Sequence, residues 1–214
     1  MFRSIILLGA PGAGKGTNAK RITKALNIPH ISTGDMFREA IKNHTKLGEE
    51  ASSYIQKGLL VPDSITIGLV KERLGKDDCK NGFLLDGFPR NVSQAEALDE
   101  IGKQLNRPIN YVIDISVPEN ILKDRICGRR VCKVCGAPYH VTNMKPKVDD
   151  KCDLCGGELI QRKDDNEEAL KVRLSEYHKQ TEPLIKYYGK ILHTVDGTKH
   201  LDEVLNEIKK IIGA

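Results

Sequence analysis

The chain has 214 residues, of which 39% are hydrophobic and 29% charged, and its 34 basic and 29 acidic residues sum to a formal charge of +5. These values are typical of a globular protein with one substantial core. The longest apolar run, around residues 5–8, is far shorter than the roughly 20 residues that span a bilayer, which excludes a membrane-spanning protein, and it is too short for a signal peptide. We therefore expect a cytoplasmic protein with no membrane partner, whose six cysteines are reduced thiols.

Short apolar segments alternate with helical patterns along the chain. Strands are predicted at residues 4–10, 29–34, 82–88, 111–116 and 191–197. Helices are predicted at residues 15–26, 64–74, 93–105, 118–128, 165–188 and 201–212. The strand segments are rich in Ile, Leu and Val without clear alternation, as expected for strands covered on both faces, and 29–34 is the weakest of them. This order predicts an α/β fold on a doubly wound parallel sheet.

Two stretches depart from this alternation. Residues 32–61 contain only short helical patterns, and residues 129–164 carry four cysteines among prolines and glycines. We interpret both as insertions into a core domain. The core is then formed by residues 1–31, 62–128 and 165–214.

The pattern Gly9-x-x-x-x-Gly14-Lys15 follows the first strand and opens the first helix. Glycines let the backbone N–H groups converge on an anion, and the helix N-terminus adds partial positive charge. Lys15 can then reach the outer phosphates of a nucleoside triphosphate. Gly16 stands where the general phosphate-loop pattern has Ser or Thr. The alternative to a phosphate site is a flexible strand–helix turn.

Four cysteines have the spacing C-x2-C-x16-C-x2-C, which indicates a structural zinc site. The predicted ligands are Cys132, Cys135, Cys152 and Cys155. Four thiolates complete a tetrahedral site and leave no position open for catalysis. Cys79 and Cys127 have no partner motif and are predicted to be packing residues.

The stretch GAPGAGKGT (9–17) resembles the phosphate loop of nucleoside monophosphate kinases, and of adenylate kinases in particular. Further segments resemble adenylate kinase motifs in the family's order: STGDMFR (32–38), DGFPRNVSQAE (86–96), DRICGRR (124–130), RKDDNEEALKVRL (162–174) and VDGTK (195–199). The resemblance covers essentially the whole chain. It implies an ATP:AMP phosphotransferase of the long-lid, zinc-containing type, with 32–61 as the AMP-binding insertion and 129–164 as the zinc-binding lid.

The family's reaction is the reversible, Mg²⁺-dependent transfer of the ATP γ-phosphoryl group to AMP, which gives two ADP and serves adenine nucleotide homeostasis. The resemblance implies that ATP, AMP and ADP are the partners, without nucleic acid, and that the protein is a monomer. Zn²⁺ belongs to the lid and Mg²⁺ accompanies ATP. No general base is needed, because the attacking AMP phosphate is largely dianionic at neutral pH.

The resemblance also implies roles for individual residues. The implied catalytic residues are Lys15, Arg90, Arg129, Arg162 and Arg173. The implied ATP-binding residues are Gly12, Ala13, Gly14, Lys15, Gly16, Thr17, Arg125, Arg129, Pro138, Tyr139 and Lys199. The implied AMP-binding residues are Thr33, Arg38, Leu59, Leu60, Val61, Gly87, Phe88, Pro89, Arg90, Gln94, Arg162 and Arg173. Asp86 is expected to orient water on Mg²⁺, with Thr17 or water in place of a hydroxyl at Gly16, and Asp164 and Asp165 are expected to close the lid.

Two other functions compete with this interpretation. One is a kinase with another donor or acceptor, such as GTP with AMP, which rates with a panel of nucleotides would distinguish. The other is a zinc-ribbon nucleic-acid module fused to a phosphate-loop switch. Against it, residues 129–164 mix Asp149, Asp150, Asp153 and Glu158 with their lysines and contain one aromatic residue, Tyr139, whereas nucleic-acid platforms cluster cations and stacking rings.

Overall fold

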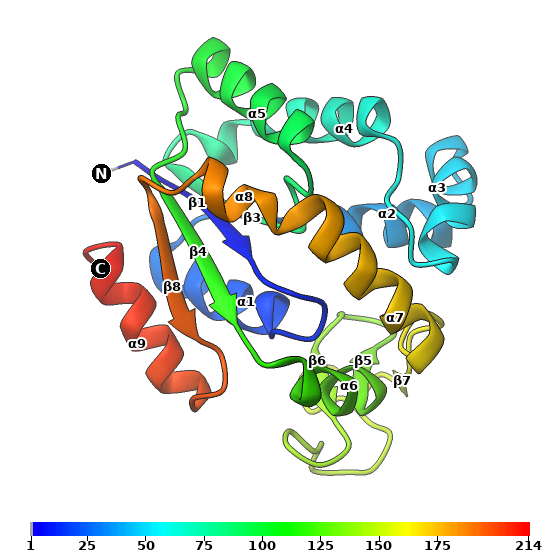
Figure 1. Ribbon diagram of the computed structural model, residues 1–214. Coiled ribbons are helices and arrows are strands. Elements are labelled where there is room, and N and C mark those ends of the chain that lie inside the picture. Colours follow the sequence, from blue (N-terminus) through cyan, green and yellow to red (C-terminus); the bar gives the residue numbers. More distant parts are fainter. Residues whose placement is uncertain (1) are drawn as a thin grey trace.

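The computed structural model describes residues 2–214 and has a parallel sheet at its centre with helices on both faces (Figure 1). Within these residues the central sheet has five strands in the order β2-β3-β1-β4-β8. Their bounds are β1 Arg3–Leu8, β2 His30–Ser32, β3 Gly82–Asp86, β4 Tyr111–Ser116 and β8 Leu192–Asp196. All neighbouring pairs of this sheet are parallel. The predicted doubly wound fold is confirmed.

Helices connect and cover these strands. Their bounds are α1 Lys15–Leu26, α2 Thr33–Lys42, α3 Lys46–Gln56, α4 Asp63–Gly75, α5 Val92–Leu105, α6 Glu119–Cys127, α7 Glu167–Glu176, α8 Pro183–Tyr187 and α9 Leu201–Ile211. A 3₁₀ turn lies at Asp77–Cys79 and a π-helical segment at Tyr177–Thr181. Across residues 2–214, no helix is both long and apolar enough to cross a membrane.

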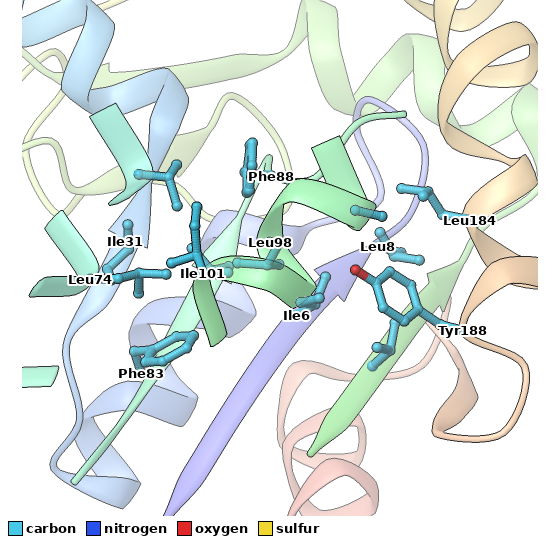
Figure 2. Packing of buried hydrophobic residues seen from close by; sticks show 14 of the residues in the cluster. Ile6, Leu8, Ile31, Leu74, Phe83, Phe88, Leu98, Ile101, Leu184 and Tyr188 are labelled. Carbon is cyan, nitrogen blue, oxygen red and sulfur yellow. The ribbon is translucent and has the colours of Figure 1, made fainter. Parts of the chain in front are cut away.

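Each face of the sheet has its own hydrophobic core. Ile6 and Leu8 of β1 point to the side covered by α4, α5 and α8, where Phe83, Leu98 and Leu184 complete the packing (Figure 2). The alternate residues, Ile5 and Leu7, face α1 and α9. Both sets are buried, which explains why the strand sequences are apolar throughout rather than alternating.

The predicted continuous helix at 165–188 is wrong in its middle. The chain forms α7, then the π-helical segment, then α8, and Glu182 N donates to Tyr177 O over five residues at 2.9 Å. The physical reason is Pro183, the first residue of α8. Proline has no N–H to donate, and its ring displaces the carbonyl of the preceding turn, so the backbone widens there.

The two stretches interpreted as insertions form elements outside the central sheet, except for Ser32, which is the last residue of β2. The rest of residues 32–61 contains α2 and α3, which approach closely at Gly48, where a Cβ atom would lie 2.3 Å from the Ala40 carbonyl oxygen. Residues 129–164 form a small antiparallel sheet in the order β6-β5-β7. Its strands are β5 Arg129–Cys132, β6 Pro138–His140 and β7 Leu159–Ile160.

Candidate active site

A cavity of about 670 Å³ opens at the carboxyl ends of the parallel strands, where doubly wound sheets bind their ligands. It is bordered by the phosphate loop, α2, the loop after β3, the small sheet and α7. The predicted site residues that line it are Gly12, Ala13, Gly14, Lys15, Gly16, Thr17, Arg38, Leu60, Asp86, Gly87, Pro89, Arg90, Arg125, Arg129, Pro138, Tyr139, Arg162, Arg173 and Lys199.

The phosphate loop bends because Gly14, the N-cap of α1, has φ 93°, a left-handed conformation that favours glycine. Lys15 Nζ donates to the carbonyl oxygens of Gly9 at 2.6 Å and Ala10 at 3.0 Å. Burial lowers the pKa of Lys15 to about 8, with Asp86 opposing the shift and nearby arginines adding to it. The ammonium group therefore sits among other cations, where phosphate oxygens would be favoured.

Gly16 lies next to Asp86. A Cβ atom at position 16 would lie 3.4 Å from Asp86 Oδ2, at the near limit of ordinary van der Waals contact. Burial tends to raise the pKa of Asp86, but the hydrogen bond from His30 at 3.4 Å and the charge of Lys15 hold it below its ordinary value. Asp86 thus stays ionised next to the loop. His30 was missed in the sequence, because nothing local signals its pairing with Asp86.

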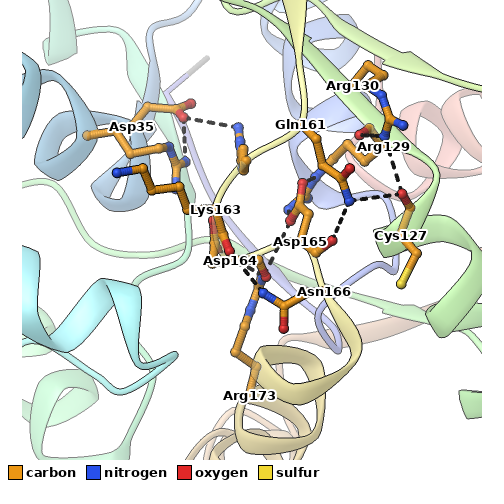
Figure 3. A network of polar contacts seen from close by, with 12 residues as sticks. Asp35, Cys127, Arg129, Arg130, Gln161, Lys163, Asp164, Asp165, Asn166 and Arg173 are labelled. Atoms are coloured by element: carbon orange, nitrogen blue, oxygen red, sulfur yellow. Dashed lines mark hydrogen bonds and ion pairs between the residues drawn. The ribbon is translucent and has the colours of Figure 1, made fainter.

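The arginines form a network with carboxylates of residues 161–166 and of α2 (Figure 3). Arg129 binds Asp165 through two nitrogens, with Nε to Oδ2 at 2.7 Å. Arg173 Nη1 lies 3.1 Å from Asp164 Oδ2 and 3.7 Å from Asp165 Oδ1. These contacts link the base of the small sheet to α7.

A second part of the network reaches α2. Asp35 accepts a hydrogen bond from Arg38 at 2.5 Å and lies 3.6 Å from Arg162. Burial, together with the charges of neighbouring arginines, lowers the pKa of both Arg162 and Arg173 to about 10. Among residues 2–214 the buried Nε of Arg162 has no hydrogen-bond partner. An anionic ligand would offset the crowded positive charge at Arg162 and could accept a hydrogen bond from its free Nε–H group.

A smaller recess of about 80 Å³ adjoins this network on the side of α2 and α3. The predicted site residues along it include Thr33, Leu59, Leu60, Val61, Gln94 and Asp164. Gln94 is held from both ends: its Nε2 donates to Asp63 at 2.7 Å and its Oε1 accepts from Arg90 N at 2.7 Å. Each end of the amide keeps capacity for one more hydrogen bond.

Not every predicted residue borders a cavity. Phe88 is fully buried in the hydrophobic core and lines neither cavity. Asp165 is buried behind Arg129 and is 1% exposed. Arg125 and Lys199 do border the larger cavity, but their charged groups have protein partners: Arg125 donates to Gly197 O at 3.0 Å, and Lys199 pairs with Glu207 at 3.0 Å. Of the two cysteines predicted to pack, Cys79 is buried and Cys127 is only partly so.

The four predicted zinc ligands come together at the tip of the small sheet. The sulfur atoms of Cys132, Cys135, Cys152 and Cys155 all lie within 4.8 Å of one another. The Cys132–Cys155 and Cys135–Cys152 sulfur pairs are each 3.5 Å apart. A tetrahedral zinc with bonds of about 2.3 Å needs sulfurs about 3.8 Å apart, so the donor set fits this metal.

A phosphate loop that shares one cavity with several arginines can hold two phosphate chains close together, which places the protein among the P-loop phosphotransferases. The family model "Adenylate kinase" matches residues 7–192. The chain is 56% identical to an adenylate kinase of Bacillus pumilus (strain SAFR-032) over 98% of each chain. It is 57% identical to one of Clostridium botulinum (strain 657 / Type Ba4) over 98% of each, and 55% identical to one of Clostridium tetani (strain Massachusetts / E88) over 99% of each. The chain belongs to the adenylate kinase family, which confirms the resemblance in its motifs.

Proposed function

We propose that this chain transfers the γ-phosphoryl group of ATP directly to AMP within the 670 Å³ cavity, reversibly and with Mg²⁺. As a member of the adenylate kinase family, the enzyme interconverts ATP and AMP with two ADP. One observation carries the assignment to this cavity: the phosphate loop and Arg38 and Arg90 border the same space. Donor and acceptor phosphates could therefore meet there without a second site.

In this proposal the phosphate loop, residues 12–17, and Arg125 hold ATP, with Pro138, Tyr139 and Lys199 beside the nucleotide. Arg38 and Arg90 hold the AMP phosphate. Thr33 and Gln94 select adenine, with residues 59–61 and 87–89 along the nucleotide. The position of Gln94 supports this, because Asp63 and Arg90 fix its amide plane and an amide can pair with an adenine edge.

The phosphoryl transfer requires stabilisation of negative charge rather than proton transfer. The attacking AMP phosphate oxygen is already largely deprotonated, since its second pKa is about 6. Arg129, Arg162 and Arg173, with Lys15, would surround the γ-phosphoryl group as its charge spreads in the transition state. Asp165 and Asp164 orient Arg129 and Arg173 through the contacts above.

Mg²⁺ that arrives with ATP would neutralise charge on the phosphate oxygens. Asp86 suits a role in holding it through water, because this carboxylate ends β3 beside Lys15 and its pKa is lowered. Thr17 lines the same part of the cavity and offers a hydroxyl that Gly16 does not.

We also propose that Zn²⁺ bound by the four cysteines is structural, and that residues 129–164 act as a lid over a core of 1–31, 62–128 and 165–214, with 32–61 binding AMP. A lid would exclude water, which competes with AMP for the phosphoryl group. Lys20 of α1 donates to Gly136 O at 2.6 Å, so the cysteine loops lie against the phosphate-loop helix. The proposal includes a cytoplasmic location, where thiols such as the four ligand cysteines stay reduced, and a monomeric enzyme.

The test is ADP formation by the purified enzyme with ATP, AMP and Mg²⁺, each omitted in turn, followed by GTP, CTP and UTP as donors. We expect ADP only when all three components are present, with ATP the preferred donor. Higher kcat/KM for GTP than for ATP would favour the GTP:AMP alternative. For the nucleic-acid alternative, Tyr139 is 7% exposed and unavailable for stacking, so we expect no salt-sensitive shift of labelled RNA or DNA.

A further inference from the structure

The hydroxyl group of Tyr139 lies inside the cysteine cluster rather than in the nucleotide cavity. Tyr139 Oη donates to Cys152 Sγ at 3.4 Å and accepts a hydrogen bond from Asp153 N at 2.7 Å. Tyr139 and Cys152 are 7% and 4% exposed and pack together with Cys132, Ala137 and Leu159. The polar end of the ring therefore has two fixed partners, both in the second C-x2-C loop.

The direction of these bonds follows from the chemistry of the phenol. A tyrosine hydroxyl has one proton to donate and lone pairs to accept. The Asp153 N–H can only donate, so it occupies a lone pair and the proton is left for the Cys152 sulfur. Asp153 Oδ1 in turn accepts from Lys147 N at 2.8 Å, which ties the long connection between the two cysteine pairs to the same point.

The second cysteine loop has a sulfur donor from outside the loop. Cys132 Sγ accepts from the backbone N–H groups of Val134 and Cys135, at 3.4 and 3.5 Å, within its own loop. Cys152 has backbone N–H groups of its own loop beside it as well, those of Leu154 and Cys155, and in addition accepts from the side chain of Tyr139 in β6, a strand that pairs with β5. The second loop is thus anchored to the lid sheet by this hydroxyl.

We propose that Tyr139 is a positioning residue for the lid metal: its hydroxyl orients Cys152 toward the other three sulfurs and slows loss of the ion. The inference rests on the proposed zinc site. Four thiolates give a divalent ion a net charge of −2, and donors to sulfur offset that excess charge. Removal of a hydrogen-bond partner of a metal ligand typically lowers metal affinity 10–100-fold. Any nucleotide contact by Tyr139 then falls to the part of the residue that borders the cavity and not to its hydroxyl group.

The test uses the full-length, zinc-loaded enzyme and its Tyr139→Phe variant. Zinc affinity is measured by competition with a chromophoric chelator, and the thiolate-to-metal absorption band is recorded after exchange of Zn²⁺ for Co²⁺. We expect affinity about 10–100-fold weaker and a band at longer wavelength, because the sulfur has lost a hydrogen bond. The KM for ATP is measured on the zinc-loaded variant alongside its metal affinity.

Tyr188→Phe is the matched control. The Tyr188 hydroxyl is also buried but has no hydrogen-bond partner among residues 2–214, so its removal should change neither zinc affinity nor the cobalt band. Incorporation of 3-fluorotyrosine at position 139 gives the opposite perturbation, since fluorine makes the hydroxyl a stronger donor. The band should then move to shorter wavelength and zinc loss should slow, an effect that a merely space-filling ring would not produce.

Three results separate the possibilities. Unchanged zinc affinity and an unchanged cobalt band in Tyr139→Phe would overturn the proposal. A raised KM for ATP with full zinc retention would also overturn it and assign the hydroxyl to the nucleotide. If the parent enzyme binds no stoichiometric zinc, the proposed zinc site itself is wrong. The metal content of the parent shows this independently of the Tyr139 variants.

Discussion

Replacement of Asp165 by Asn removes one negative charge from the centre of the arginine network. The carboxylate is 1% exposed and receives Arg129 Nε at 2.7 Å, with Arg173 Nη1 at 3.7 Å. Asn has almost the same size, but its NH₂ group would face the guanidinium donors of Arg129. The lost charged hydrogen bond corresponds to about 1.5–3 kcal/mol. If Asp165 holds Arg129 in the orientation that the transition state needs, kcat/KM falls about 10- to 150-fold.

The assay is kcat/KM for ATP and for AMP by coupled detection of ADP, with thermal melting of the same samples. Asp202→Asn is the matched control, because Asp202 also pairs with an arginine, Arg21, but is 63% exposed, and exposed pairs contribute only about 0–1 kcal/mol. We expect Asp202→Asn to change kcat/KM less than twofold. A loss below about threefold in folded Asp165→Asn would refute the idea that Asp165 orients Arg129 for catalysis.

Four more predictions concern separate parts of the molecule. Burial lowers the pKa of Lys15 to about 8 from 10.5, so a pH profile of kcat/KM for ATP should fall as pH rises through 8, whereas Lys15→Arg should show no such step. The same depressed pKa means that the free energy of unfolding of the parent, measured in urea, should rise from pH 8 to 10.5 relative to that of Lys15→Met, because unfolded Lys15 binds a proton there that folded Lys15 has lost. Gln94→Ala should raise KM for AMP by the equivalent of about 1–3 kcal/mol and leave KM for ATP unchanged; equal rises would rule out selective reading of AMP. Cys152→Ser should lose zinc and melt earlier in calorimetry while keeping much of its activity at low temperature; inactivity with a folded lid would indicate a catalytic metal. Gly48→Ala should destabilise by about 1–3 kcal/mol or more and raise KM for AMP, because its Cβ would lie 2.3 Å from the Ala40 carbonyl; unchanged melting would contradict that packing.

Much of the fold was predictable because its signals are local. The helix predicted at 15–26 matches α1, since a glycine-rich loop and a helical pattern adjoin there. The strands were recognisable as apolar runs, because Ile5 and Ile6 are both buried, one on each face of the sheet. The cysteine cluster was predictable for the same reason, as each C-x2-C pair lies within one turn.

The rest depended on contacts between distant residues. Nothing near Gln94 in the sequence indicates that Asp63 fixes its amide, and the pairing of His30 with Asp86 is equally invisible. Tyr139 looked like a nucleotide contact by resemblance, yet its hydroxyl binds Cys152 across 13 residues. The roles of the individual site residues stay predictions until they are tested.

We propose direct phosphoryl transfer between two nucleotides in one cavity, with Lys15 among the groups that stabilise the transferred charge. The most direct measurement follows γ-³²P-labelled ATP mixed with Mg²⁺ and unlabelled AMP, with the parent enzyme and with Lys15→Met shown by circular dichroism to be folded. We expect the label to appear in the β-phosphate of ADP at the rate of ATP loss, and Lys15→Met to remove most of this transfer. Label released mainly as inorganic phosphate, or near-normal transfer by folded Lys15→Met, would contradict the proposal.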